Sequence, residues 1–112
     1  MSGCVFCGIA PAQIPATVVL ETERTLAFLD VAPQAPTHVL VIPREHHPDV
    51  AAVAAADPTL LTELMTSAVT VADRQALTGG YRLLTNTGED AGQTVSHAHV
   101  HVLGGRPLGP LG

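Results

Sequence analysis

The sequence is poor in aromatic and charged residues. These two shortages limit which residues can form the core and which classes of partner the protein can bind. It contains no Trp, one Tyr and two Phe among 112 residues, so its core must be built from Val, Leu, Ile and Ala. Charged residues make up 13%, and the five basic side chains, outnumbered by ten acidic ones, form no cluster. Proteins that bind the backbone of DNA or RNA carry a basic patch, so a nucleic-acid partner is not expected.

Long apolar runs and abundant cysteines are also absent. No stretch approaches the roughly 20 apolar residues that cross a bilayer, so no membrane partner is expected. The first eight residues show no basic segment followed by an apolar core, which argues against a secretion signal. Two cysteines fit a reducing compartment better than a disulfide framework. These features predict a cytoplasmic protein.

The length and the spread of apolar residues predict one domain, residues 1–112, with a short C-terminal tail at about 106–112. Strands are expected at 16–22, 25–30, 38–43, 81–87 and 96–103. Asp49 is placed to cap a short helix, and Asp57 followed by Pro58 begins the main helix, which should end at the glycine pair 79–80. The fold class is therefore α+β: an antiparallel sheet with one main helix and a short helix.

Three histidines occupy alternate positions in SHAHVHVL, residues 96–103. On a strand, His97, His99 and His101 share one face, while the apolar residues between them share the other. A merely solvated face is usually mixed in composition, so it explains three aligned imidazoles poorly. The pattern predicts a row of imidazoles on one side of the sheet, and this row is the candidate functional site.

Two chemistries can use such a row. Two histidines at i and i+2 can bind one zinc ion, and His38 or His46 could complete such a site. His97 and His101 lie roughly 13 Å apart along a strand, which disfavours a centre that uses all three. Alternatively, a neutral imidazole attacks phosphorus, while the other imidazoles and the glycine-containing loop 88–95 donate hydrogen bonds to phosphate oxygens.

The segment HAHVHVL, residues 97–103, resembles the His-x-His-x-His-x-x motif of the histidine triad (HIT) family. The similarity to its Hint-like branch covers nearly the whole chain, through CVFCGIA (4–10), IPA (14–16), LAFLD (26–30), PQAPTHVLVIP (33–43), YRLLTNTG (81–88), GQTV (92–95) and LGGRP (103–107). The resemblance implies a homodimer with a five-stranded antiparallel sheet in each subunit, which binds purine nucleotides of the AMP or GMP type.

The resemblance also implies an enzyme, because many members are hydrolases or transferases acting on the α-phosphate of nucleoside phosphoramidates. We therefore expect a purine nucleoside 5′-phosphoramidate hydrolase, adenosine phosphoramidase-like, that works through a nucleotidyl-histidine intermediate. Within the family the alternatives are a nucleotidyl transferase and a dinucleoside polyphosphate hydrolase. A nucleotide-binding regulatory module would use the same residues without productive turnover. A zinc hydrolase, from a third class, would lose its activity on chelation.

The resemblance assigns roles to individual residues. His99 matches the histidine that becomes nucleotidylated, His101 the histidine that contacts the phosphate, and His38 a histidine on a neighbouring strand that supports the nucleophile. In relatives, apolar residues from the first strands enclose the purine. The residues expected to contact the nucleotide, at ribose, phosphate or base, are Asp30, Asn86, Gly92, Gln93, Thr94, Phe6, Ile9, Phe28 and Leu29.

Cys4 and Cys7 form a C-x-x-C pair, which by itself fits half of a zinc site, a redox pair or chance. Relatives with this pair add a histidine after an I-P-x-x-H stretch and the first histidine of the triad. Here those positions are His46 and His97, although His47 is adjacent to His46 and competes for the role. The resemblance implies a structural zinc site that leaves the phosphate chemistry to the other histidines, with no metal in the reaction.

Overall fold

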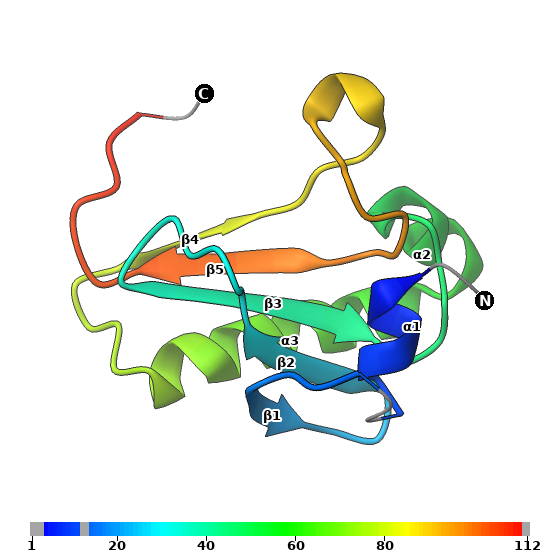
Figure 1. Ribbon diagram of the computed structural model, residues 1–112, viewed down its shortest axis with the longest axis horizontal. Coiled ribbons are helices and arrows are strands. Elements are labelled where there is room, and N and C mark those ends of the chain that lie inside the picture. Colours follow the sequence, from blue (N-terminus) through cyan, green and yellow to red (C-terminus); the bar gives the residue numbers. More distant parts are fainter. Residues whose placement is uncertain (1–3, 12–13, 111–112) are drawn as a thin grey trace.

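The computed structural model describes residues 4–11 and 14–110, and its centre is a five-stranded antiparallel sheet (Figure 1). The strands are β1 (Val18–Glu21), β2 (Thr25–Leu29), β3 (Thr37–Pro43), β4 (Tyr81–Leu84) and β5 (Val100–Gly104), in the order β1-β2-β3-β5-β4. Every neighbouring pair is antiparallel. The predicted fold class and sheet are therefore confirmed.

Two helices begin where the sequence predicts. In α2 (Val50–Ala56) and α3 (Pro58–Arg74), the first turn is capped by an aspartate that precedes the helix. The carboxylates of Asp49 and Asp57 accept hydrogen bonds from the backbone N–H groups of Ala52 and Leu60. The main helix ends earlier than the predicted glycine pair, because Ala76 takes a left-handed conformation with φ of 56°.

A third helix, α1 (Val5–Ile9), was not predicted, and a short 3₁₀ turn, η1 (Glu89–Ala91), lies in the loop before the histidine segment. Phe6 and Ile9, which we expected on strands, therefore lie on a helix. The Cys4 sulfur caps this helix by accepting a hydrogen bond from the Cys7 N–H. A helix of five residues is too short to show a hydrophobic period, so apolar patterning cannot reveal it.

Apolar side chains fill both faces of the sheet. On one face, α3 packs against Val39, Val41, Val100 and Val102. On the other, Phe6 and Ile9 from α1 pack against a second cluster whose sheet members are Leu26, Phe28, Leu40 and Ile42. Alternate residues of β3 thus point to opposite faces, as a pleated strand requires.

The histidine segment joins the sheet later than predicted. β5 begins at Val100, so His97 and His99 precede the strand and only His101 lies within it. The reason is local: the Ala98 N–H donates to the carbonyl of His47, in the loop that follows β3, instead of to a neighbouring strand. The alternation still holds, because Ala98 and Val100 pack on the α3 side.

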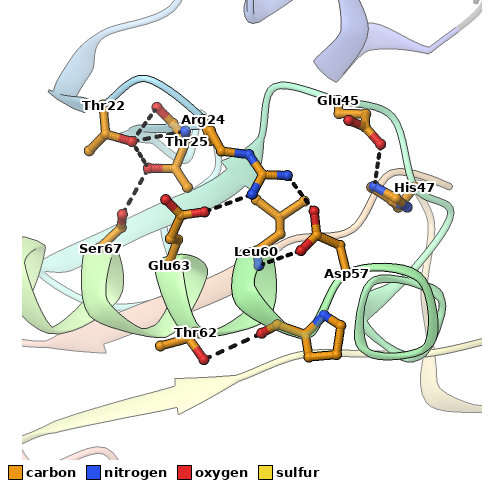
Figure 2. Close-up of polar contacts among 11 residues, drawn as sticks. Thr22, Arg24, Thr25, Glu45, His47, Asp57, Leu60, Thr62, Glu63 and Ser67 are labelled. Carbon is orange, nitrogen blue, oxygen red and sulfur yellow. Dashed lines mark hydrogen bonds and ion pairs between the residues drawn. The ribbon is translucent and has the colours of Figure 1, made fainter.

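Arg24 fastens the turn between β1 and β2 to the start of α3 (Figure 2). Its guanidinium pairs with Asp57 and, at 3.0 Å, with Glu63. This contact holds the pKa of Asp57 below its usual range, and the helix-capping hydrogen bond to Leu60 lowers it further.

Among the described residues, no helix is both long enough and apolar enough to cross a bilayer.

Candidate active site

His99 lies between two groups of polar side chains and has a defined ring orientation. Its Nδ1 is 2.7 Å from the carbonyl oxygen of His97. A carbonyl oxygen only accepts hydrogen bonds, so the neutral His99 ring carries its hydrogen on Nδ1. The lone pair is therefore on Nε2. His99 is 7% exposed, and the edge-to-face contact of its ring with Phe6, at 5.2 Å between centroids, restrains the ring on one side.

His101 and His38 form a hydrogen-bonded chain beside His99. The N–H of Gln34 donates to Nδ1 of His38 at 3.0 Å, so the hydrogen of the His38 ring is on Nε2. This Nε2 lies 2.8 Å from Nδ1 of His101 and donates to it. The remaining hydrogen of His101 is therefore on Nε2, where it can be donated to an anionic oxygen. The centroids of the His99 and His101 rings are 5.0 Å apart.

Burial keeps this chain neutral. It lowers the pKa of His38, an effect that the Asp30 carboxylate opposes. Burial and the neighbouring His99 and His38 lower the pKa of His101 to about 4. We expected His38 to support the nucleophile, and the structure places its ring against His101, the neighbour of His99. The reason is the sheet register: His38 pairs with Leu103 and Leu40 with His101, so the two imidazoles are diagonal neighbours.

Asp30 lies in the same group as His38 and His101. Its Oδ2 is 3.5 Å from Nε2 of His38, and its Oδ1 accepts the N–H of Ala32 at 2.8 Å. Asp30, His38 and His101 are close enough to suggest a metal site. Because the His38 ring receives a hydrogen bond at Nδ1, its Nε2 carries a hydrogen and has no lone pair for a cation. The arrangement favours a proton-carrying chain over a metal centre.

Cys4, Cys7, His46 and His97 form the second group, and their ligand atoms all lie within 4.8 Å of one another. The Nδ1 atoms of the two histidines are 3.2 Å apart, and Cys7 Sγ is 3.2 Å from His46 Nδ1. Nε2 of His97 lies 2.9 Å from the carbonyl of Pro43 and donates to it, which leaves the lone pair of Nδ1 facing the cluster.

These distances suit a tetrahedral metal. Metal–nitrogen bonds of about 2 Å and metal–sulfur bonds of about 2.3 Å place neighbouring ligand atoms roughly 3.3–3.8 Å apart. Burial also lowers the pKa of His97, which keeps its ring neutral and able to bind a cation. The ring of His47 points elsewhere, 3.0 Å from Glu45 (Figure 2). The four residues named from the sequence are thus the ones brought together, and they can hold a metal.

Hydrogen bonds of the Gln93 side chain hold the conformation of the loop before the histidine segment. The Gln93 side chain accepts from the Gly88 N–H at 2.9 Å and donates to the carbonyls of Pro48 and Val95 at 2.7 and 3.0 Å. These contacts shape the loop, and the expected donation from this side chain to phosphate stays a prediction. Gly92 is left-handed, with φ of 84°, and Thr94 is exposed.

The expected base-binding residues divide into two sets. Phe6, Ile9 and Phe28 are buried in the core between α1 and the sheet, whereas Leu29 is 39% exposed beside Asp30. Burial in the core leaves the first three little surface for a base.

Comparison with known proteins places this geometry in a family. The family model described as the HIT domain matches residues 11–108. The chain belongs to the HIT family. It is 42% identical to the purine nucleoside phosphoramidase of Escherichia coli over 108 residues, 96% of this chain and 91% of the relative. It is also 45% identical over 104 residues to an uncharacterized HIT-like protein of Synechococcus elongatus, 93% of this chain and 91% of the relative.

Solved structures agree. This HIT chain superposes on a HIT family hydrolase from Clostridium thermocellum with a TM-score of 0.93 and 42% identity, covering 99% of this chain and 97% of the other. A histidine triad protein from Clostridium difficile gives a TM-score of 0.94 at 34% identity, covering 100% and 98%. The family expected from the histidine motif is confirmed.

Proposed function

We propose that this HIT protein hydrolyses the P–N bond of purine nucleoside 5′-phosphoramidates. The observation that carries the proposal is the hydrogen bond of His99 Nδ1 to the His97 carbonyl, which leaves Nε2 as a free nucleophile beside His101. A relative with 42% identity over nearly the full chain is named a purine nucleoside phosphoramidase, which supports the same activity here.

The reaction proceeds in two displacements on the α-phosphorus. Nε2 of His99 forms a bond to phosphorus, the P–N bond breaks, and the departing amine takes a proton from solvent. The His97 carbonyl holds Nδ1–H and stabilises the positive charge that develops on the ring. Water then attacks phosphorus and gives up a proton to solvent, the bond to Nε2 breaks, and the nucleoside monophosphate is released. Throughout, Nε2–H of His101 donates to a non-bridging oxygen of the phosphate.

The nucleotide occupies the side of the sheet where these rings lie. We assign Asp30 to the ribose hydroxyls and Asn86 to the ribose and phosphate. Gly92 and Thr94 line the phosphate side of the loop that Gln93 braces. Among the apolar candidates, the exposed Leu29 is the one that offers surface to the base.

The Cys/His cluster is proposed to hold a structural zinc ion. Cys4, Cys7, His46 and His97 provide a Cys₂His₂ donor set with suitable separations. When bound, the ion supplies cross-linking between α1 and the segment before β5, and the phosphate chemistry remains with the imidazoles. Metal analysis of protein purified without added zinc should give about one ion per chain, and a stoichiometry near zero would refute this assignment.

We also propose that one domain, residues 1–112, assembles as a cytoplasmic homodimer. β4 is at one end of the strand order, so in the part of the chain that the structure describes it has a sheet partner on one side only. Apolar side chains at least 40% exposed lie on β4 and on α3: Tyr81, Met65 and Val69. A second copy would cover these groups and the strand edge. The molar mass in solution, from light scattering, tests this.

His99→Ala is the variant that tests the function. We expect hydrolysis of adenosine 5′-phosphoramidate to fall by several orders of magnitude, while AMP still binds, because the variant lacks only the nucleophile. The native enzyme should show a nucleotidyl adduct at His99 by intact-mass analysis after rapid quenching. Equal turnover by the variant would refute the assignment.

A panel of phosphoramidates and dinucleoside polyphosphates separates hydrolysis of P–N bonds from the alternatives, and absence of repeated turnover would indicate a binding module.

A further inference from the structure

We propose that His97 is a positioning residue for the reaction, and that metal binding at the Cys/His cluster raises the rate at which His99 attacks phosphorus. This inference rests on the proposed function, in which Nε2 of His99 is the nucleophile. It differs from a purely structural role for the cluster, because emptying the cluster then changes the chemistry of a chain that is still folded.

The sheet does not hold the backbone of residues 97–99, the segment that carries the nucleophile. β5 begins at Val100, so residues 97–99 have no ladder partners. The Ala98 N–H donates to the His47 carbonyl at 2.7 Å, and the His97 ring donates to the Pro43 carbonyl at 2.9 Å. Both acceptors lie in the stretch 43–47 that also carries His46. The His99 carbonyl also accepts a hydrogen bond from the Thr85 hydroxyl at 2.7 Å, so the stretch 43–47 and the cluster set the position of His97 and Ala98, and Thr85 holds the far end of the segment.

His97 contacts both the nucleophile and the Cys/His cluster. The His97 carbonyl accepts the Nδ1–H of His99 at 2.7 Å, and the His97 ring presents its own Nδ1 to Cys4, Cys7 and His46. The His97 side chain is completely buried and held at both nitrogens. If it turns, the carbonyl leaves His99, and the His99 hydrogen is free to move to Nε2, which removes the lone pair that attacks phosphorus.

Helix α1 makes a further connection between the cluster and His99. Phe6 lies between the two cysteines in sequence, and its ring packs edge-on against both His97, at 5.9 Å, and His99, at 5.2 Å. A helix of five residues is not stable in isolation, so α1 depends on its anchors. Loss of the metal would loosen this second support of the His99 ring as well.

The expected effect is on the chemical step. Misplacing a reacting group by about 1 Å can lower a rate by about 100-fold, so we expect kcat to fall about 10- to 100-fold when the cluster is empty. KM for the phosphoramidate should change less than about twofold, because the proposed ribose contact, Asp30, lies in the other group.

The experiment compares the purified zinc-loaded chain, the same chain after chelation, and the chain reloaded with zinc. One readout is kcat and KM with adenosine 5′-phosphoramidate. The other is the ring tautomer of His99, from long-range ¹H–¹⁵N spectra of histidine-labelled protein without substrate. We expect one Nδ1–H tautomer in the loaded chain, a mixture after chelation, and recovery of tautomer and kcat together on reloading. A depleted chain with full kcat and an unchanged tautomer would overturn the inference.

Val71→Ala is the matched control for lost stability. Val71 is buried on α3, on the opposite face of the sheet from the histidine rings. The variant should be less stable yet keep kcat and the His99 tautomer, and an equal loss of both would overturn the inference. If chelation removes the far-UV circular dichroism signal, His46→Ala replaces the depleted chain, at the lowest zinc concentration that keeps this signal. Full kcat with an unchanged His99 tautomer in that variant would overturn the inference. An active His99→Ala would instead refute the proposed function.

Discussion

The two histidine groups use the same side chain for different purposes. In the group of Cys4, Cys7, His46 and His97, the ligand atoms converge and the lone pair of His97 Nδ1 points to a common centre. In the group of Asp30, His38 and His101, the Gln34 N–H donates to His38 and the His38 ring donates to His101, so hydrogens lie between the nitrogens. The difference teaches that the partner of the second ring nitrogen decides whether an imidazole binds a cation or passes on a hydrogen bond.

The largest effect is expected from Cys7→Ser, which removes one ligand of the first group. Metal content should fall toward zero, and the free energy of unfolding should decrease by more than about 3 kcal/mol, because the binding energy of a structural metal contributes to folding. Metal analysis and urea unfolding measure both quantities. A variant that keeps full metal content and stability would show that the four residues do not act as one centre.

His101→Ala, in the second group, should lower kcat and leave the metal content unchanged. Loss of the donor to the phosphate oxygen should reduce kcat about 10²- to 10³-fold, as with other donors to a developing charge. Metal content should stay unchanged, since His101 has no contact with the cluster in the described structure. Parallel measurements of kcat and metal content check the prediction, and loss of metal would show that the two groups are not independent.

The free energy of unfolding should depend on pH through His101, a member of the second group. The pKa of His101 is about 4 in the folded chain, below the 6.5 of a free histidine. The unfolded chain therefore binds more protons between these values, and the stability present above pH 6.5 is lost as the pH falls toward 4. We expect about 2 kcal/mol of that loss to come from this partly buried group. Urea unfolding of the native chain and His101→Asn at pH 7 and 4.5 measures it, and parallel losses would contradict it.

Arg24→Ala should have the smallest effect and touch neither group. Its ion pairs with Asp57 and Glu63 are partly exposed, and such pairs contribute about 0–1 kcal/mol. Thermal unfolding should show a small decrease in stability, with kcat and metal content unchanged. A large change in either would reveal a connection between the β1–β2 turn and the histidines.

Local features were predicted well from the sequence. Asp49 and Asp57 cap the two helices as expected, because capping depends only on the next few residues. The alternation at residues 97–101 also placed the imidazoles on one side, with Ala98 and Val100 on the other. Helix α1 was missed because a single capped turn leaves no period in the sequence.

Burial and bonding at the site could not be read from the sequence. Phe6, Ile9 and Phe28 lie in the core between α1 and the sheet, and this burial depends on how α1 packs on strands distant from it in the chain. The Gln93 amide bonds with Gly88 and Val95 in its own loop and with the distant Pro48, and only the folded loop brings these groups together. The roles of these residues toward base and phosphate stay predictions.

By itself, the sequence determined the residue types of both groups, the faces on which they lie and the family to which the chain belongs. Only the tertiary structure decided which ring nitrogen carries the hydrogen. That choice depends on acceptors and donors at Pro43, Gln34 and the His97 carbonyl, whose distances from each ring are set by strand register and loop packing. No local pattern encodes those distances, because they follow from how remote segments pack together.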